Sequence, residues 1–221
     1  LGSASALLKL GDIYSSGRFG GRRLKEARAF YEKAAAAGDP YGLFALGRNL
    51  AVDSPQGSKA AARGFALLQK SEASGVPYAA PALADSYFYG LGTKPNPKKA
   101  IAALAAAAGR GNSVAAAKLV EAHRNGKRDG DVTVLRRDPK RAAATLAELS
   151  PGMADADVSG QRFLNRLSMT GDRAFKRLYG ELRQLPSAAQ ESIVSGLADA
   201  NDRFYVFVMQ SRLGELGYFK K

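Results

Sequence analysis

The sequence contains no cysteine and no tryptophan, and it has a single histidine, His123, among its 221 residues. Without cysteine, disulfide bonds and thiolate-bound zinc are excluded, while the redox compartment stays open because a cysteine-free chain suits any of them. One imidazole with scattered carboxylates also falls short of the ligand set of a metal centre. These absences argue against a disulfide scaffold and against a metalloenzyme, so we expect no metal and no other cofactor.

Long apolar runs are absent as well. No stretch reaches the roughly eighteen consecutive apolar residues of a transmembrane helix, and the first ten residues do not place a basic segment before an apolar one, as a secretory signal does. We therefore expect a soluble chain without a membrane span. Leu1, Gly2 and Ser3 are typical of a cloning scar, in which case the chain is an excised domain of a longer protein.

Basic residues are in excess, with 33 Lys and Arg against 20 Asp and Glu, a net charge of +13. Such a charge favours anionic partners, and nucleic acid, acidic polysaccharide, peptidoglycan, anionic lipid and acidic protein all qualify. A solvated surface without a ligand is the alternative. The aliphatic content is largely alanine and leucine, which favours helices packed through small residues and predicts an all-α protein.

Four similar segments follow one another, ALLKLGDIYSSG, GLFALGRNLAVD, PALADSYFYG and AAKLVEAHRNG. Their shared leucines, Leu10, Leu46, Leu83 and Leu119, are separated by 36, 37 and 36 residues. This period is about the length of one helical hairpin. Leu46 and Leu83 are expected to lie in the core between helices.

The ends of the helices are marked as well. Gly17 and Gly90 stand where a helix stops in a left-handed residue. Asn96 and Asp138, each followed by proline, have the side chains that cap the start of a second helix. The sequence therefore predicts a right-handed superhelical α-solenoid of helix-turn-helix repeats with a C-terminal helical cap. The expected repeats are 4–38, 39–75, 76–111 and 112–150, and the cap is 151–221.

The pattern LGDIYSSG…KEARAFYEKAAAAGDP, echoed by LADSYFYGLGTKPNPKKAIAALAAAAGRGN, resembles the Sel-one-like repeat (SLR), a tetratricopeptide-like (TPR-like) unit. The resemblance covers residues 4 to about 150. It implies a scaffold or adaptor that binds partners in a concave groove or through its loops, in bacteria often at or outside the inner membrane. It implies no catalysis and no cofactor.

The alignment places His123 four residues after Leu119, in the column of Tyr14 and Tyr87. A structural role follows without any chemistry, because a hydrolytic triad would also need a nucleophile and an orienting acid. No catalytic residue is therefore predicted.

The fourth repeat is longer than the first and third by six residues, within KRDGDVTVLRRD. Insertions in a solenoid map to one edge, where loops often bind partners. Arginine grips carboxylates and phosphates with two parallel hydrogen bonds. We expect an acidic partner, protein or glycan, to be held by Arg136 and Arg137. The basic residues around them complete the predicted partner-binding set: Lys127, Arg128, Lys140 and Arg141.

Residues 208–219, VMQSRLGELGYF, are similar to the opening helix of small peptidoglycan-binding modules, in which Met209, Gln210, Leu213, Leu216, Gly217 and Tyr218 match. This similarity favours the periplasm or the cell envelope. The leading hypothesis is a non-enzymatic envelope scaffold that binds a protein or an anionic polysaccharide or peptidoglycan. The alternative is a cytoplasmic adaptor for protein or nucleic acid, although no motif that reads nucleic acid is present.

Overall fold

The computed structural model describes residues 3–17 and 20–215, apart from the side-chain surroundings of residues 195, 199 and 214. The described chain is almost entirely helical and divides into two compact units, residues 1–110 and 111–221. The predicted boundary at residue 150 differs from this division, because the fourth hairpin packs with the helices that follow it.

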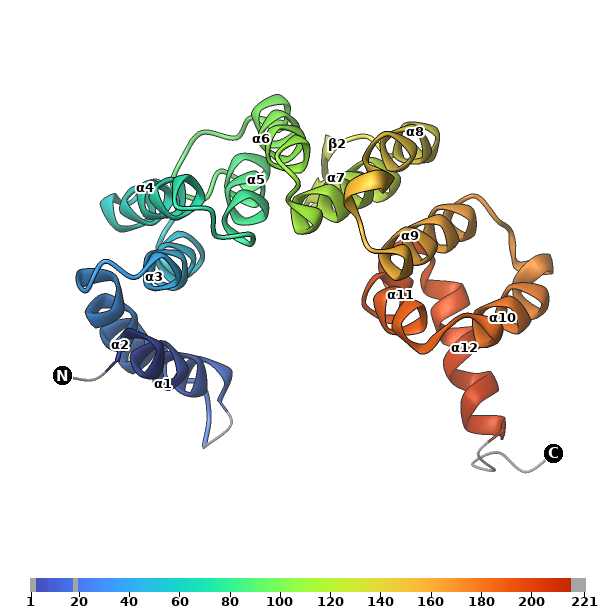
Figure 1. Cartoon of the computed structure of the whole chain (residues 1–221), viewed down its shortest axis with the longest axis horizontal. Helices are drawn as coiled ribbons and strands as arrows, with labels where there is room; N and C mark the ends of the chain where they lie inside the picture. Colours follow the sequence, from blue (N-terminus) through green and yellow to red (C-terminus); the bar gives the residue numbers. More distant parts are fainter. Residues whose placement is uncertain (1–2, 18–19, 216–221) are drawn as a thin grey trace. The chain divides into compact units, whose positions relative to one another are not determined.

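The first unit consists of three helical hairpins (Figure 1). Within each hairpin the two helices pack against each other, and consecutive hairpins meet through α2 with α3 and through α4 with α5. Its helices are α1 (Ala4–Ser16), α2 (Leu24–Ala36), α3 (Pro40–Asp53), α4 (Lys59–Ala73), α5 (Ala79–Tyr89) and α6 (Pro97–Gly109).

Polar residues fix where several of these helices begin. The side chain of Asn96 accepts a hydrogen bond from the Lys99 amide at 3.0 Å, and Asp39 and Ser58 cap α3 and α4 in the same way. Each bond satisfies one of the free amides at a helix start. The predicted cap at Asn96 is therefore confirmed, and Gly90 ends α5 with a φ of 71°, in the left-handed region that favours glycine.

Small residues let the helices of a hairpin approach closely. In the second hairpin, a Cβ added to Gly64 would lie 2.5 Å from the amide nitrogen of Ala51, and one added to Gly47 would lie 3.0 Å from the carbonyl oxygen of Gly64. The distance at Gly64 is too short for any side chain, because the obstacle is backbone, and the distance at Gly47 is at the lower limit of real contacts. The α3–α4 crossing therefore requires glycine at Gly64 and is tight at Gly47.

The shared leucines behave differently at the end of the repeat array and inside it. Leu46, Leu83 and Leu119 are buried, with 1%, 7% and 4% of their surface exposed, whereas Leu10 is 40% exposed. Leu46 and Leu83 are core residues, as predicted. Leu10 departs from its column because α1 packs on α2 and on part of α3, and no earlier helix of the described chain covers its other side.

The second unit begins with the fourth hairpin, and α9 links this hairpin to the C-terminal helices. The helix α7 contacts α8 and α9, and α11 contacts α9 and α12. Its elements are α7 (Ser113–Asn125), β1 (Lys127–Asp129), β2 (Val132–Leu135), α8 (Pro139–Leu149), α9 (Asp155–Ser168), α10 (Phe175–Gln184), α11 (Ser187–Ala200) and α12 (Asp202–Glu215), with short 3-10 turns at Ser150–Gly152 and Asp172–Ala174.

The inserted segment of the fourth hairpin is not a simple lengthened turn. It forms a short antiparallel β-hairpin in which Arg128 pairs with Thr133 and Asp129 with Val132. Gly130, with a φ of 53°, makes the tight turn between the strands. The all-α prediction is thus correct for the helices but missed this local exception, because alternation over four residues is too short a signal to recognise.

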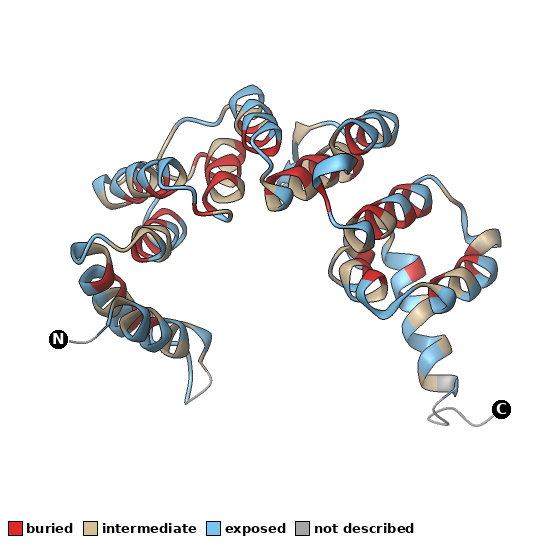
Figure 2. Ribbon diagram, viewed as in Figure 1, coloured by how far each residue is buried: buried red, intermediate tan, exposed pale blue. Residues whose placement is uncertain are grey.

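The C-terminal helices form a core of their own. Phe163 of α9, Phe175 of α10 and Phe204 of α12 are buried together, and the rings of Phe175 and Phe204 meet edge to face with centroids 5.1 Å apart. The helix α11 also contributes buried residues to this core. Figure 2 shows the buried residues of α9 and α11 as red ribbon. The start of α12 is therefore part of this core. Of the residues similar to a peptidoglycan-binding helix, Leu216, Gly217 and Tyr218 lie outside the described residues.

Leu83 is buried and Leu10 is exposed, although both occupy the shared leucine position of the repeat. Replacing each by alanine therefore gives a matched test of the repeat packing. We expect Leu83→Ala to lower the free energy of unfolding by about 2–5 kcal/mol, through lost burial and the cavity left behind. Leu10→Ala should cost about 1 kcal/mol or less, since Leu10 is 40% exposed. Urea unfolding followed by circular dichroism measures both changes. Equal losses for the two variants would show that the column does not mark the core.

Candidate binding surfaces

The first unit contains a groove of about 550 Å³ between α1, α3 and the start of α5. Its apolar part is exposed to solvent to an unusual degree: Tyr41 is 48% exposed, Tyr78 53% and Val52 58%. The ring of Phe44 lies 6.2 Å from that of Tyr78. Large apolar side chains gathered in a concavity are typical of a surface that a partner covers.

One carboxylate of the groove is held by the buried residue Tyr31. The Tyr31 hydroxyl donates to Asp12 at 2.9 Å and lies 3.2 Å from the Ser15 hydroxyl. Burial, reinforced by the negative charge of Asp12, raises the pKa of Tyr31. The tyrosine therefore remains a neutral donor that fixes the Asp12 carboxylate without cancelling its charge.

A second carboxylate, that of Asp53, is held by a relay of two side chains. The Asn49 amide donates to Asp53 at 2.6 Å, and its carbonyl oxygen accepts from Nε of Arg28 at 2.8 Å. The Asn49 side chain is 9% exposed, so its two hydrogen bonds determine its orientation. Neither Asp12 nor Asp53 forms an ion pair with any residue that the structure describes.

Arg22 and Arg48 also line the groove, together with Asp39, whose carboxylate caps α3. Arg22 donates through Nε to the main-chain carbonyl of Ser15 at 3.0 Å. The groove therefore has three carboxylates and two guanidinium groups, a net charge of −1 on a chain whose overall charge is +13.

His123 lies in the second unit, in the position that the repeat assigns to a tyrosine. In three of the hairpins, the main-chain carbonyl of the residue in this column accepts a hydrogen bond from a main-chain amide. The amide belongs to the N-cap residue of the second helix. The pairs are Arg23 with Tyr14 at 2.9 Å, Asn96 with Tyr87 at 2.6 Å and Asp138 with His123 at 2.6 Å. Burial, and then the nearby Arg141, lower the pKa of His123, while Asp138 opposes them. This shared hydrogen bond is made by the main chain and does not involve the imidazole, so a structural role for the His123 side chain stays a prediction.

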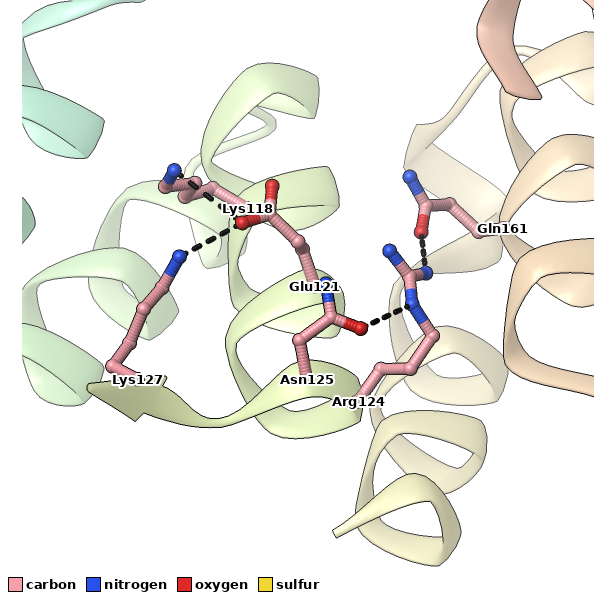
Figure 3. A network of polar contacts seen from close by, with 6 residues as sticks. All are labelled: Lys118, Glu121, Arg124, Asn125, Lys127 and Gln161. Atoms are coloured by element: carbon pink, nitrogen blue, oxygen red, sulfur yellow. Dashed lines mark hydrogen bonds and ion pairs between the residues drawn. The ribbon is translucent and has the colours of Figure 1, made fainter. Parts of the chain in front are cut away.

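Two clusters of polar side chains include residues of α7 close to His123 in the sequence. One cluster is centred on Glu121 and the other on Arg124, and Figure 3 shows both. Glu121 pairs with Lys127 at 2.8 Å and with Lys118 at 3.5 Å. Burial alone would raise the pKa of Glu121, but the two lysines outweigh it and the pKa is lowered. Lys127, one of the predicted partner-binding residues, thus has an internal role that ties β1 to α7.

The second cluster is centred on Arg124, which is 1% exposed and is among the largest fully buried side chains. Its Nη1 donates to Oε1 of Gln161 at 2.6 Å and its Nε to Oδ1 of Asn125 at 3.1 Å (Figure 3). Arginine stays charged in proteins, so these acceptors are needed to offset its loss of water. The contact joins α7 to α9 and was not foreseen from the sequence.

The other predicted partner-binding residues lie on the β-hairpin, on the link after β2 and on the first turn of α8. Arg128 donates to the main-chain oxygen of Asp131 at 3.2 Å. Arg136, Arg137, Lys140 and Arg141 are exposed and form no ion pair within the described part of the chain. Val132, at the turn end of β2, is 66% exposed. The segment and the start of α8 therefore present exposed basic residues, and whether they bind a partner stays a prediction.

Across residues 3–17 and 20–215, no three His, Asp or Glu side chains are grouped so as to hold a metal ion. In the same residues, no helix combines the length and the apolar character needed to cross a bilayer. The groove was missed at the sequence level because the contacts Tyr31–Asp12 and Arg28–Asn49 join residues about twenty positions apart on different helices. The pair Asn49–Asp53, four positions apart on α3, has no distinctive pattern by itself.

Neither a protein-family model nor a curated protein matches the sequence. Among solved structures, the fold is similar to that of c5321, a protective antigen present in uropathogenic Escherichia coli strains and described as displaying an SLR fold. That match has a TM-score of 0.52 and 18% sequence identity, and it covers 96% of this chain and 40% of the antigen chain. A Sel1 repeat protein from Oxalobacter formigenes aligns with a TM-score of 0.49 and 20% identity over 91% of this chain and 73% of its own.

The class of protein is therefore an all-α helical-repeat solenoid. More narrowly, its fold is that of the Sel1-like repeat proteins, as the sequence pattern predicted. The chain spans 40% of the length of the E. coli antigen.

The pKa of His123 gives a test of its structural role. Because the folded protein lowers this pKa below the ordinary value of 6.5, the unfolded chain binds more protons, and stability is lost as pH falls through that range. We expect His123→Tyr to fold and to lose less stability than wild type between about pH 7 and about pH 5. Glu121 contributes only at lower pH, since its pKa is lowered from 4.5. Parallel stability curves for the two proteins, measured by urea unfolding, would contradict this role.

Proposed function

We propose that the protein is a non-enzymatic scaffold that binds another protein through the groove of its first unit. The supporting observation is the concave surface in which Tyr41, Tyr78 and Val52 are about half exposed or more. Aromatic rings in a concavity are the usual anchors of protein interfaces, because they bury much area at little cost in side-chain entropy. The mixed charge of the groove favours a polypeptide over a polyanion such as an acidic polysaccharide.

Photo-crosslinking tests this proposal. We expect benzoylphenylalanine introduced at Tyr41 or Tyr78 to form a protein adduct in intact cells, since a bound partner would cover both positions. The control is the same residue at Lys70, which is exposed on α4 and outside the groove. Adducts of the same abundance at all three positions, or none at either tyrosine, would contradict the proposal.

The same experiment addresses location. We propose that the scaffold works at the bacterial cell envelope, on the basis of the resemblance between residues 208–219 and wall-binding helices. A crosslinked partner that resides in the envelope would support this location. A cytoplasmic partner would favour the alternative, a cytoplasmic adaptor.

A second proposed surface is the basic edge around Arg136 and Arg137, which we propose contacts an acidic partner. Both side chains are exposed and without an ion-pair partner in the described chain, and the pair Glu121–Lys127 anchors the β-hairpin before them. Arg136 and Arg137 follow β2 directly and precede α8, so both of their neighbours along the chain are ordered elements. Arginines held in this way lose less entropy on binding than arginines in a long unstructured loop would.

The test is the double variant Arg136→Glu with Arg137→Glu. We expect it to fold and to lose capture of partners from an envelope extract at low salt, with the difference from wild type shrinking as salt rises. The matched control is Lys94→Glu with Lys98→Glu, which makes the same change in net charge at exposed sites of the first unit. Equal loss in the two double variants would show a general charge effect and no binding by the hairpin.

A further inference from the structure

The groove in the first unit has features that select the charge of what it binds. The Asp12 and Asp53 carboxylates are each held by a side chain that donates a hydrogen bond without an opposite charge, Tyr31 for Asp12 and Asn49 for Asp53. Their positions are therefore fixed before any partner arrives. Fixed charges of this kind attract an opposite charge without a cost of ordering their own side chains.

The aromatic side chains favour the same charge. Tyr41 and Tyr78 are about half exposed, and Phe44 lies against Tyr78. The face of an aromatic ring attracts the ammonium group of lysine and the guanidinium group of arginine. Two independent features of one groove thus favour a cation, although Arg22 and Arg48, also in the lining, limit the positive charge that the groove accepts.

From these contacts we infer that the groove binds a polypeptide segment in which a lysine or arginine is flanked by apolar residues. The cation contacts Asp12, Asp53 or both, and the apolar residues cover Tyr41, Tyr78 and Val52. This inference rests on the proposed function and specifies the chemistry of its partner. It also runs against the overall charge of +13, which would by itself attract acidic partners.

Selection of random 12-residue peptides displayed on phage tests the inference. Wild-type protein is the target, and the variant Tyr41→Ser with Tyr78→Ser is used for counter-selection, so that peptides bound elsewhere are removed. We expect the retained peptides to be enriched in Lys and Arg relative to the starting library. Because non-specific binding to this chain favours acidic peptides, such an enrichment is not explained by background.

The retained peptides are then synthesised and titrated by calorimetry. Asp12→Asn with Asp53→Asn should weaken their binding about three- to tenfold, the range expected for two exposed ion pairs. Asparagine keeps an oxygen acceptor for Tyr31 and Asn49, so the fold should be unchanged, as circular dichroism would check. The control Asp129→Asn with Asp131→Asn makes the same charge change on the exposed turn of the β-hairpin and should leave the affinity unchanged.

The outcomes separate the two proposals. If counter-selection removes every peptide, the groove does not bind peptides, and both the proposed function and this inference fail. If groove-dependent peptides remain but have no excess of Lys or Arg, or if the two double aspartate variants bind them equally, only the inference about charge is overturned.

Discussion

The close approach of helix backbones through small residues is the constraint on which the first unit depends. A Cβ on Gly64 would lie 2.5 Å from the amide nitrogen of Ala51 where α4 crosses α3, and one on Gly92, in the turn after α5, would lie 2.1 Å from the carbonyl oxygen of Ala61 in α4. These contacts are made by backbone atoms, so they set the approach of α4 to α3 and to the turn after α5 more strictly than flexible side chains would. The helix α3 and the start of α5 in turn supply residues of the groove.

The second unit has, beside its apolar core, a different kind of contact between helices. A buried arginine, Arg124, reaches from α7 to Gln161 of α9. On α11, a Cβ added to Gly196 would lie 3.7 Å from Nη2 of Arg124 and 2.8 Å from Cδ1 of Leu164, so glycine leaves room for both side chains. A buried charge with good acceptors adds little stability by itself, but it is costly to separate from them. This contact helps explain why the fourth hairpin groups with the C-terminal helices.

The charge of the chain shows how an average over the sequence differs from the chemistry of one surface. The excess of basic residues indicated an anionic partner, and the edge near Arg136 and Arg137 is consistent with that expectation. The groove has a net charge of −1 and fixed carboxylates at Asp12 and Asp53. If both proposals hold, one scaffold has two surfaces of opposite preference, which would let it bring together two partners of unlike charge.

Neighbouring residues are enough to predict the hairpin period, the caps at Asn96 and Asp138, the burial of Leu46 and Leu83, and the place of His123 in a tyrosine column. These features depend on local hydrogen bonds and on a spacing repeated along the chain, both of which can be read from the order of the residues. Which distant side chains meet could be seen only in the folded chain. Tyr31 reaches Asp12 across 19 positions, and Arg124 reaches Gln161 across 37. No periodicity encodes such pairs, because they arise from how whole helices pack.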